Sequence, residues 1–238
     1  MYLSIIIPTL NEADYLATNI ERLKHNSVLD DKKEIIVIDS DSSDNTCEIA
    51  RELKVRLIKG KKRKLGKAHV LNEAAQVAEG EAYLFLDADT LVPPGYDKMV
   101  DIALSNPEVV GGAFEFALDG PEFGLRVVEL INRIRYRIRQ RYYGDQGIFV
   151  RANMFRRVGG YPEIGLLEAA YLCKKLKKEG KLKLIKEHMK TSPRRFIDGG
   201  IYRVLASDIK IWFLDLTGVG IDKYAPAYWK ENKVRSKN

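Results

Sequence analysis

The feature that most constrains the fold is an alternation of short apolar runs and helix-like segments through the first half of the chain. Leu3–Ile7 is a continuous apolar run ended by Pro8, as expected for a strand buried on both faces. Glu12–Lys24 then places apolar residues at helical spacing. Repetition of this strand–helix order is typical of an open α/β sheet, so we predict one that is mostly parallel.

The same patterns predict the remaining elements. Expected strands are Leu3–Ile7, Glu34–Ile38, Val55–Lys59, Ala82–Leu86, Val109–Leu118 and Ile148–Val150, with one or two more in Lys181–Thr191. Expected helices are Glu12–Lys24, Thr46–Leu53, Lys67–Ala78, Tyr96–Leu104, Pro121–Tyr143 and Leu166–Glu179, followed by a helical tail from Arg194. The long basic helix places Leu125, Val128, Ile131, Ile134 and Ile138 on one apolar face.

Several protein classes are disfavoured by composition. The two cysteines, Cys47 and Cys173, lie far apart and suggest neither a disulfide framework nor a zinc site, so we expect a reducing, cytoplasmic setting. No stretch approaches the roughly 20 apolar residues that cross a bilayer, and the N-terminus does not resemble a signal peptide.

The net charge of +7 favours an anionic partner: nucleic acid, a diphosphate ligand or an acidic membrane surface. No recognised nucleic-acid motif accompanies the charge, so nucleic acid is not the expected partner.

Polar residues gather directly after the predicted strands. Pro8–Glu12, Asp39–Asp44 and Asp87–Thr90 each follow an apolar strand, and Lys59–Lys67 adds basic residues after another. Open α/β sheets bind ligands beyond the carboxyl ends of their strands, where these segments would meet. Carboxylates beside lysines suit a nucleotide diphosphate held together with a hard divalent cation.

Each polar segment also has a simpler interpretation. The motif Asp-x-Asp occurs by chance, and Asp39–Asp44 can be a turn that caps the next helix. Lys59–Lys67 resembles a nucleic-acid or nuclear-localisation patch, although a solvated loop is commoner. Glycine-rich fingerprints of dinucleotide folds and P-loops are absent, which argues against a dehydrogenase or an ATPase. The joint placement of the segments after successive strands favours the nucleotide-binding interpretation.

At this point the sequence resembles the family 2 glycosyltransferases, which have the GT-A fold. The matching pieces are SIIIPTLNE, IIVIDSDSSDNT, Gly66-Lys67-Ala68, LFLDADT, YGDQGIFVR followed by VGGYPE, and LLEAAYLCKKL. They occur in family order over residues 2–180, and the YGDQ and TSPRRF segments are similar to one bacterial and archaeal branch. The resemblance implies a Rossmann-like α/β domain whose central sheet is flanked by helices. Within it we expect a donor half (1–90), an acceptor half (91–192) and a C-terminal helical extension (193–238).

The resemblance also implies roles for matching positions. The expected nucleotide-sugar contacts are Pro8, Thr9, Leu10, Asn11, Glu12, Asp39, Asp41, Lys67, Asp87, Ala88 and Asp89. Among them, Asp39 would contact the base, Lys67 would lie near the ribose or diphosphate, and Asp87 and Asp89 would hold Mn²⁺ or Mg²⁺. Gln146, Arg194 and Arg195 would serve the acceptor or the diphosphate. For the two arginines, a solvent-facing helix start is the competing interpretation.

One position departs from the family pattern. Family members carry Glu-Asp where this chain has Glu168-Ala169, and that aspartate normally acts as the general base. Alanine cannot accept a proton, and loss of a general base typically costs about 10²–10⁴ in rate. Three explanations remain open: Glu168 or Asp145 supplies the carboxylate, the acceptor is an already anionic phosphate, or the chain binds donor without efficient transfer.

The expected function is therefore metal-dependent, inverting transfer of a hexose from a nucleotide-diphosphate sugar to an acceptor hydroxyl or phosphate. UDP is the first expectation for the nucleotide and GDP the next, and the acceptor would be a glycan or a lipid-linked molecule. The alternative is a nucleotide-sugar-binding protein impaired by Ala169. A second expectation concerns peripheral contact with the inner face of a membrane, through Trp212, Phe213 and Leu216, which have lysines nearby. The competing interpretation is a C-terminal helix packed on the domain.

Overall fold

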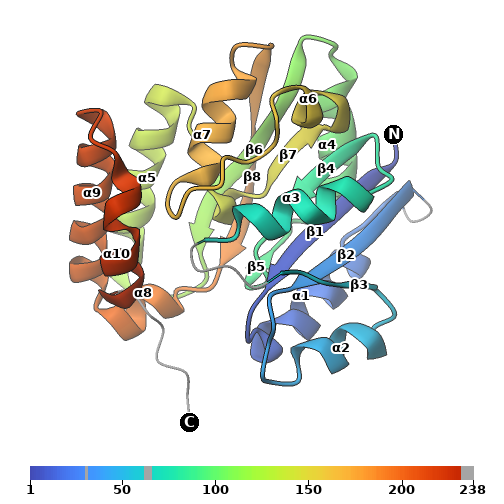
Figure 1. Cartoon of the computed structure of the whole chain (residues 1–238), viewed down its shortest axis with the longest axis horizontal. Coiled ribbons are helices and arrows are strands. Elements are labelled where there is room, and N and C mark those ends of the chain that lie inside the picture. The colour runs from blue at the N-terminus through green and yellow to red at the C-terminus, as the bar shows by residue number, and fades with distance from the viewer. Residues whose placement is uncertain (30–31, 62–65, 232–238) are drawn as a thin grey trace.

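The computed structural model describes residues 1–29, 32–61 and 66–231. This part of the chain forms a central sheet with helices on both faces (Figure 1). Its strands lie in the order β3-β2-β1-β4-β7-β6-β8-β5. They are β1 (Leu3–Thr9), β2 (Lys33–Asp39), β3 (Arg56–Lys59), β4 (Ala82–Phe85), β5 (Thr90–Leu91), β6 (Val109–Leu118), β7 (Ile148–Arg151) and β8 (Lys181–Thr191).

The sheet is parallel in its first half and mixed in its second. Strand β1 pairs in parallel with β2 and β4, and β2 pairs in parallel with β3, as the alternating pattern predicts. Strand β7 then runs antiparallel to both β4 and β6. The short β5 runs antiparallel to β8, whereas β6 and β8 are parallel. The parallel half brings the ends of β1, β2 and β4 to one edge, which is where the polar segments begin.

The predicted helices are present in the predicted order, with boundaries that shift by a few residues, and a further short helix at Ala152–Arg157 was not predicted. They are α1 (Ala13–His25), α2 (Thr46–Glu52), α3 (Ala68–Val77), α4 (Tyr96–Ser105), α5 (Phe123–Arg139), α6 (Ala152–Arg157), α7 (Glu168–Leu176), α8 (Arg194–Gly199), α9 (Ile201–Leu216) and α10 (Ala225–Glu231). Short 3₁₀ turns include η2 (Gly144–Gln146) and η3 (Ile221–Tyr224). No helix within the described ranges is both long and apolar enough to cross a membrane.

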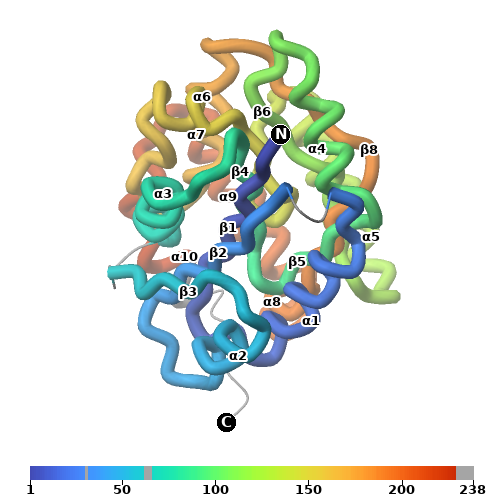
Figure 2. The backbone as a smooth tube through the Cα atoms, turned by 90° about the vertical axis from the view of Figure 1, so that its right-hand side faces the viewer, coloured from blue at the N-terminus to red at the C-terminus, as the bar shows by residue number. Residues whose placement is uncertain are grey.

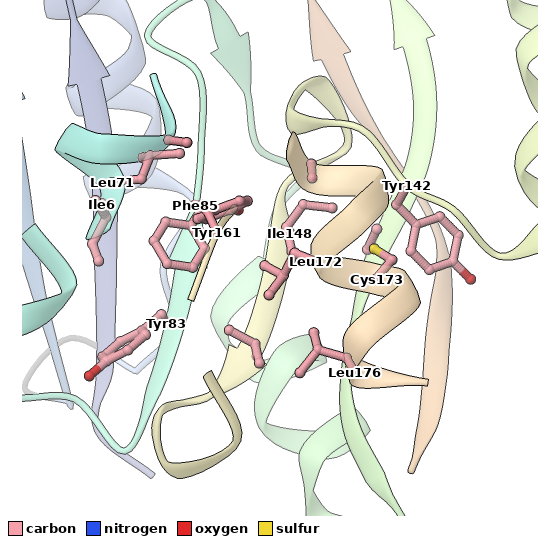
Figure 3. Close-up of a cluster of buried hydrophobic side chains, with 14 of the residues drawn as sticks. Ile6, Leu71, Tyr83, Phe85, Tyr142, Ile148, Tyr161, Leu172, Cys173 and Leu176 are labelled. Carbon is pink, nitrogen blue, oxygen red and sulfur yellow. The ribbon is translucent and has the colours of Figure 1, made fainter. Parts of the chain in front are cut away.

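Two apolar cores lie on opposite faces of the sheet. Alternate residues of β1 point to opposite faces, so Ile5 and Ile7 pack with α1 and α4 while Ile6 packs with α3. The face that carries Ile6 also receives α7, whose Leu172, Cys173 and Leu176 lie against the strands (Figure 3). Helix α7 therefore rests on the same core as α3, and both begin near the polar edge of the sheet.

The predicted helix Pro121–Tyr143 is too long, and its single apolar face is wrong. Helix α5 ends at Arg139 because Gln140 adopts a left-handed backbone, φ +48°. Leu125 and Val128 are buried against the domain, whereas Ile134 is 51% and Ile138 72% exposed. These two isoleucines lie on a second, outward face of the helix.

The helical tail expected after Arg194 is confirmed and lies at one end of the molecule, beside α5 (Figure 1). Seen from the opposite end, the N-terminal strands and α1 to α3 lie in front of these C-terminal helices (Figure 2). A third, small apolar cluster joins Ile211 of α9, Ile221 of η3 and Ala225 of α10 to Leu166, in the segment before α7. The extension therefore packs on the segment that leads into Glu168.

Candidate active site

The ends of β1 and β2 are tied together by polar side chains. Thr9 pairs with Asp39 in the sheet, and its Oγ1 donates to the Asp39 carboxylate at 3.0 Å. The backbone N–H groups of Asp41 and Ser42 donate to the other carboxylate oxygen at 3.1 and 2.9 Å. Burial opposes ionisation of Asp39, but the hydrogen bonds from Ser42 and Thr9 outweigh it and lower the pKa of the carboxyl.

The two loops that follow are also joined. Asn11 has a left-handed backbone, φ +56°, a conformation that asparagine tolerates better than most residues. Its N–H donates to Ser42 Oγ at 2.8 Å, and its side-chain oxygen accepts the N–H of Ser43 at 2.8 Å. Thr9 and Asp39 are 2% and 3% exposed. The bonds of Thr9 to Asp39, and of Asn11 to the serines, therefore hold the two loops together. Leu10 and Asp41, in the same loops, are exposed.

The end of β4 meets the start of α3 through an ion pair between Asp87 and Lys67. Burial would lower the pKa of the Lys67 ammonium, but Asp87 and then Glu168 raise it above its ordinary value, so the side chain is a cation. A Cβ at Gly66 would lie 2.9 Å from the carbonyl oxygen of Ile164. Glycine therefore allows the chain to bring Lys67 against the segment that precedes α7.

A small cavity opens beside this ion pair. It is lined by Lys67, Asp87, Gly144, Tyr161, Glu168 and Ala169, with a volume of about 10 Å³. That volume admits about one water molecule. The cavity is therefore far smaller than a nucleotide sugar.

The Arg194 side chain occupies the other end of the same edge. Its guanidinium donates to both carboxylate oxygens of Glu12 at 2.8 Å and to Asp89 at 3.0 Å. It also lies over the ring of Tyr15, 4.4 Å from the ring centroid. Arg194 thus joins α1 and the segment between β4 and β5 to the segment after β8. Both carboxylates of the Asp-x-Asp motif are paired with cations.

Two further carboxylates face this region. Glu168 is the first residue of α7 and follows Leu167, whose φ of +60° is unusual for a branched side chain. Asp145 lies in η2, directly after Gly144 of the cavity wall. Burial, and secondarily repulsion by Asp87, raises the pKa of Asp145 to about 6. Burial also raises the pKa of Glu168, partly offset by Lys67.

The electrostatic character of the site is set by an excess of carboxyl groups. Burial raises the pKa values of Glu12 and Asp89 as well, and the charge on Asp87 adds to the increase at each. Asp87 therefore disfavours the charged form of four neighbouring carboxyls, namely Glu12, Asp89, Asp145 and Glu168. An additional cation near Asp87 would relieve this repulsion.

The residues fit a divalent cation only with help from a ligand. Asp87 and Asp89 provide hard oxygen donors, which Mg²⁺ and Mn²⁺ prefer. Within the described residues, however, no group of three or more histidine, cysteine, aspartate or glutamate side chains converges to hold a metal. Magnesium sites commonly use one or two carboxylates and take further ligands from phosphates and water. Asp87 and Asp89 would therefore complete a divalent-cation site only together with further oxygen ligands, such as phosphate and water.

Two of the residues predicted for the acceptor or the diphosphate bond to neighbouring groups of the protein. Gln146 is 1% exposed, and its amide donates to Phe114 O at 3.1 Å, so it supports the η2 turn instead of facing a ligand. Arg195 bonds to Asp208 of α9 and to the Tyr228 hydroxyl of α10. Arg194 and Arg195 therefore serve different neighbours despite adjacent positions. Residues 62–65 of the basic Lys59–Lys67 segment lie outside the described residues.

Sequence reasoning missed three contributors. The ring of Tyr15, in α1, lies under the guanidinium of Arg194. Tyr161 lines the cavity and packs edge-on against Phe85, with ring centroids 4.9 Å apart (Figure 3). At Gly144 a Cβ would lie 2.7 Å from Lys67 Nζ, so a side chain there would shift the end of the lysine. The Gly-Asp-Gln-Gly motif was the only available signal for the last of these.

Comparison of sequences gives a clear family match. The sequence model of glycosyl transferase family 2 matches residues 4–163, more than half of the chain. Among curated proteins, a dolichol-phosphate mannosyltransferase of Pyrococcus furiosus is 34% identical over 127 residues. That alignment covers 48% of this chain and 36% of the relative, so the match spans about a third of the relative's length.

Comparison of structures gives the same fold. A mannosyltransferase from Pyrobaculum calidifontis, solved with GDP-Man and Mn²⁺, superposes with a TM-score of 0.67 at 21% identity, covering 98% of this chain and 69% of that one. Glucosyl-3-phosphoglycerate synthase from Mycobacterium tuberculosis, solved with Mn²⁺ and UDP-glucose, gives 0.66 at 16% identity, covering 92% and 80%. S. aureus TarS gives 0.64 at 17% identity, covering 100% and 44%. At these identities the likeness establishes the GT-A fold.

Proposed function

Because the chain belongs to glycosyl transferase family 2, we propose that it transfers a hexose from a nucleoside diphosphate sugar with inversion at the anomeric carbon. The observation that supports this most directly is the meeting of Lys67, Asp87 and Glu168 around one cavity, with Asp89 and Arg194 beside it. Cations for phosphates, oxygen ligands for a metal and a carboxylate near the cavity are the groups that glycosyl transfer requires.

The donor would bind at the carboxyl ends of β1, β2 and β4. We propose that Pro8–Glu12 and Asp39–Asp41 contact the nucleoside, and that Lys67 lies against the diphosphate. Lys67 and Arg194 pair with Asp87 and Asp89, and we propose that both side chains move to phosphate oxygens when a donor binds.

Asp87 and Asp89 would hold Mn²⁺ or Mg²⁺, whose charge stabilises the departing nucleoside diphosphate. Mn²⁺ is present in the structures of the two neighbours solved with GDP-Man and UDP-glucose. In this chain the repulsion centred on Asp87 favours a cation at the same place.

Glu168 is our candidate for the general base. Glu168 is one of the residues that line the cavity, whereas Asp145 is not and follows the lining residue Gly144. The acceptor hydroxyl would transfer its proton to Glu168 as its oxygen bonds to the anomeric carbon. The bond from that carbon to the diphosphate oxygen breaks, and its electron pair stays with the diphosphate. Ala169, 3% exposed at the cavity wall, leaves no second carboxylate on this turn of α7.

The nucleotide and acceptor are proposed at the level of class. The fold neighbours include proteins solved with GDP-Man, UDP-glucose and UDP, so we propose a uridine or guanosine diphosphate hexose as donor. An acceptor that carries a hydroxyl or a phosphate, on a glycan or a lipid, suits a basic chain with net charge +7.

A second candidate is a nucleotide-sugar-binding protein with impaired catalysis. Ala169 favours it, because this buried alanine stands where the family places its base. Both candidates predict donor binding, and only the first predicts turnover.

Calorimetric titration with UDP-, GDP- and dTDP-sugars, in Mn²⁺ and then in chelator, tests the proposal. We expect one nucleotide to bind in Mn²⁺ and to lose affinity in chelator, and Asp89→Asn to bind more weakly.

Slow donor hydrolysis should then fall about 10²–10⁴-fold in Glu168→Gln. Hydrolysis unchanged in Glu168→Gln but lost in Asp145→Asn would move the base to Asp145. Binding with no turnover by wild type, regained in Ala169→Asp, would support the binding-protein candidate. No binding of any donor would overturn both.

A further inference from the structure

Exposed large apolar side chains are concentrated at one end of the molecule. In the described part of the chain eight of twelve belong to α5, α8 and α9. These eight are Phe123, Leu130, Ile134, Ile138, Ile197, Tyr202, Ile209 and Phe213. Helices α5 and α9 pack directly on each other, and a Cβ at Gly124 would lie 3.0 Å from Ile201 Cγ2 (Figure 1).

Each of the two long helices carries its exposed apolar residues as a single stripe. At roughly 100° per residue, Phe123, Leu130, Ile134 and Ile138 fall within about 80° of one another around α5. Tyr202, Ile209 and Phe213 fall within about 40° around α9 by the same geometry. Their exposed fractions range from 39% for Ile209 to 78% for Phe123. An outward stripe on both helices is more than the scatter of single apolar residues that any surface shows.

The inner sides of the same helices are fully engaged. Val128 and Tyr136 of α5 are buried in the main core, and Val204 of α9 is buried with them. Asp215, about opposite to the stripe of α9, bonds to the Tyr171 hydroxyl and pairs with Arg141. Helices α5 and α9 therefore each have a buried inner face that packs on the domain and a separate apolar face that is exposed.

Basic side chains border the stripes. Helix α5 carries five arginines and one glutamate, a net charge of +4 (5 − 1). Arg126 and Arg137 are exposed beside the stripe of α5, where they pair with Glu129 and Glu115, and Arg203 and Lys210 are exposed on α9. The acidic residues of α9, Asp208 and Asp215, are paired with Arg195 and Arg141 on its inner side. The outward face thus combines apolar side chains with positive charge.

We propose that the outward faces of α5 and α9 form a docking surface for an anionic lipid bilayer. The apolar stripes would enter the headgroup–acyl boundary while the arginines and lysine remain at the level of the anionic headgroups. This contact extends the earlier expectation based on Trp212, Phe213 and Leu216: Phe213 belongs to the stripe, whereas Trp212 and Leu216 are half-buried. It goes beyond the proposed function, because lipid binding requires neither donor nor acceptor.

Flotation with phosphatidylcholine vesicles, with and without phosphatidylglycerol, tests the surface. Wild-type protein should float with the anionic vesicles, and less so at high salt, because salt screens the arginines. The double variants Leu130→Gln/Ile134→Gln and Ile209→Gln/Phe213→Gln should each weaken binding by about tenfold or more, since two apolar side chains no longer leave water. Val28→Gln and Ile102→Gln, each changed at a side chain that is 61% exposed on other elements, serve as matched controls and should bind like wild type.

The variants replace exposed residues, and circular dichroism checks that they fold. Failure of wild type to float with anionic vesicles would overturn the proposal. Equal loss in the Val28 and Ile102 controls would do the same. A wild-type dimer in analytical ultracentrifugation that both double variants dissociate, without vesicle binding by wild type, would assign the stripes to a second copy of this chain. None of these outcomes bears on donor binding, which the calorimetry measures separately.

Discussion

At the scale of single residues, the site is defined by how its charges are paired before a ligand arrives. Arg194 bonds to Glu12 and Asp89, and Lys67 pairs with Asp87, so the predicted metal ligands already have cationic partners. A metal ion must compete with Lys67 and Arg194 for the carboxylates of Asp87 and Asp89. A bound diphosphate would give the two cationic side chains another anion to pair with. Metal and donor binding are therefore expected to strengthen each other.

The variant Arg194→Gln tests this competition. Without its guanidinium, Asp89 is free for metal, so we expect Mn²⁺ to bind about tenfold more tightly in the absence of donor, the order expected for one partly buried ion pair. Donor affinity in saturating Mn²⁺ should fall, because one cation no longer reaches the diphosphate. Electron paramagnetic resonance measures free Mn²⁺ directly. The control Arg51→Gln removes the same charge from exposed α2 and should leave Mn²⁺ affinity unchanged. Weaker Mn²⁺ binding in Arg194→Gln would show that Arg194 supports the metal site instead.

At the scale of elements, short polar contacts decide how helices join the sheet. Asp97, in the first turn of α4, is 2% exposed. It accepts the N–H groups of Val28 at 3.1 Å and Leu29 at 2.9 Å, and the hydroxyl of Ser27. Burial opposes its ionisation, but these hydrogen bonds outweigh it and lower the pKa of the carboxyl. One ionised side chain thus fixes the segment after α1 to the start of α4.

This lowered pKa predicts a pH dependence of stability. A carboxyl whose pKa is lower in the folded state stabilises the fold above its unfolded pKa, near pH 4, and loses that contribution as pH falls through the folded value. Asp97→Asn should therefore reduce the free energy of unfolding by about 1.5–3 kcal/mol at pH 7. The difference from wild type should shrink steadily below about pH 4. Urea unfolding across this range measures it, and a difference independent of pH would contradict the assignment.

At the scale of the whole molecule, the C-terminal extension braces the segment that carries Glu168. Asp222 of η3 accepts the N–H of Gly165 at 2.6 Å, and Asp215 of α9 accepts the Tyr171 hydroxyl at 2.7 Å. Leu166 packs with Ile211 and Ile221. Residues far along the chain therefore hold the start of α7 in place.

Hydrogen exchange measured by mass spectrometry tests this brace in the intact chain. Asp222→Ala and Tyr171→Phe should each speed exchange of backbone amides in 161–171, because they remove one anchor of that segment. Amides of β1, buried in the sheet, should exchange as in wild type. Donor binding should persist while turnover falls, since the donor loops are untouched and Glu168 is displaced. Unchanged exchange in 161–171 would show that the segment holds its position without the extension.

Much of this protein was determined by local sequence. The apolar runs and the helical spacing predicted the order of the elements, because strand and helix periodicity are short-range properties. The GT-A fold was predicted separately, from the family resemblance. The polar segments after β1, β2 and β4 could be placed on one edge for the same reason: parallel strands bring their carboxyl ends together. The roles assigned to individual site residues stay predictions.

Only the tertiary structure decided which side chains meet. Arg194 reaches Glu12 across most of the chain, Gln146 turns inward, and Arg195 bonds to α9 and α10, none of which periodicity encodes. Local spacing also gave α5 one apolar face, whereas packing over β6 buries Val128 and leaves Ile134 and Ile138 outside. The physical reason is that a helical pattern reports how apolar residues are spaced along a segment. Which of them leave water depends on the neighbours that the fold brings to each face.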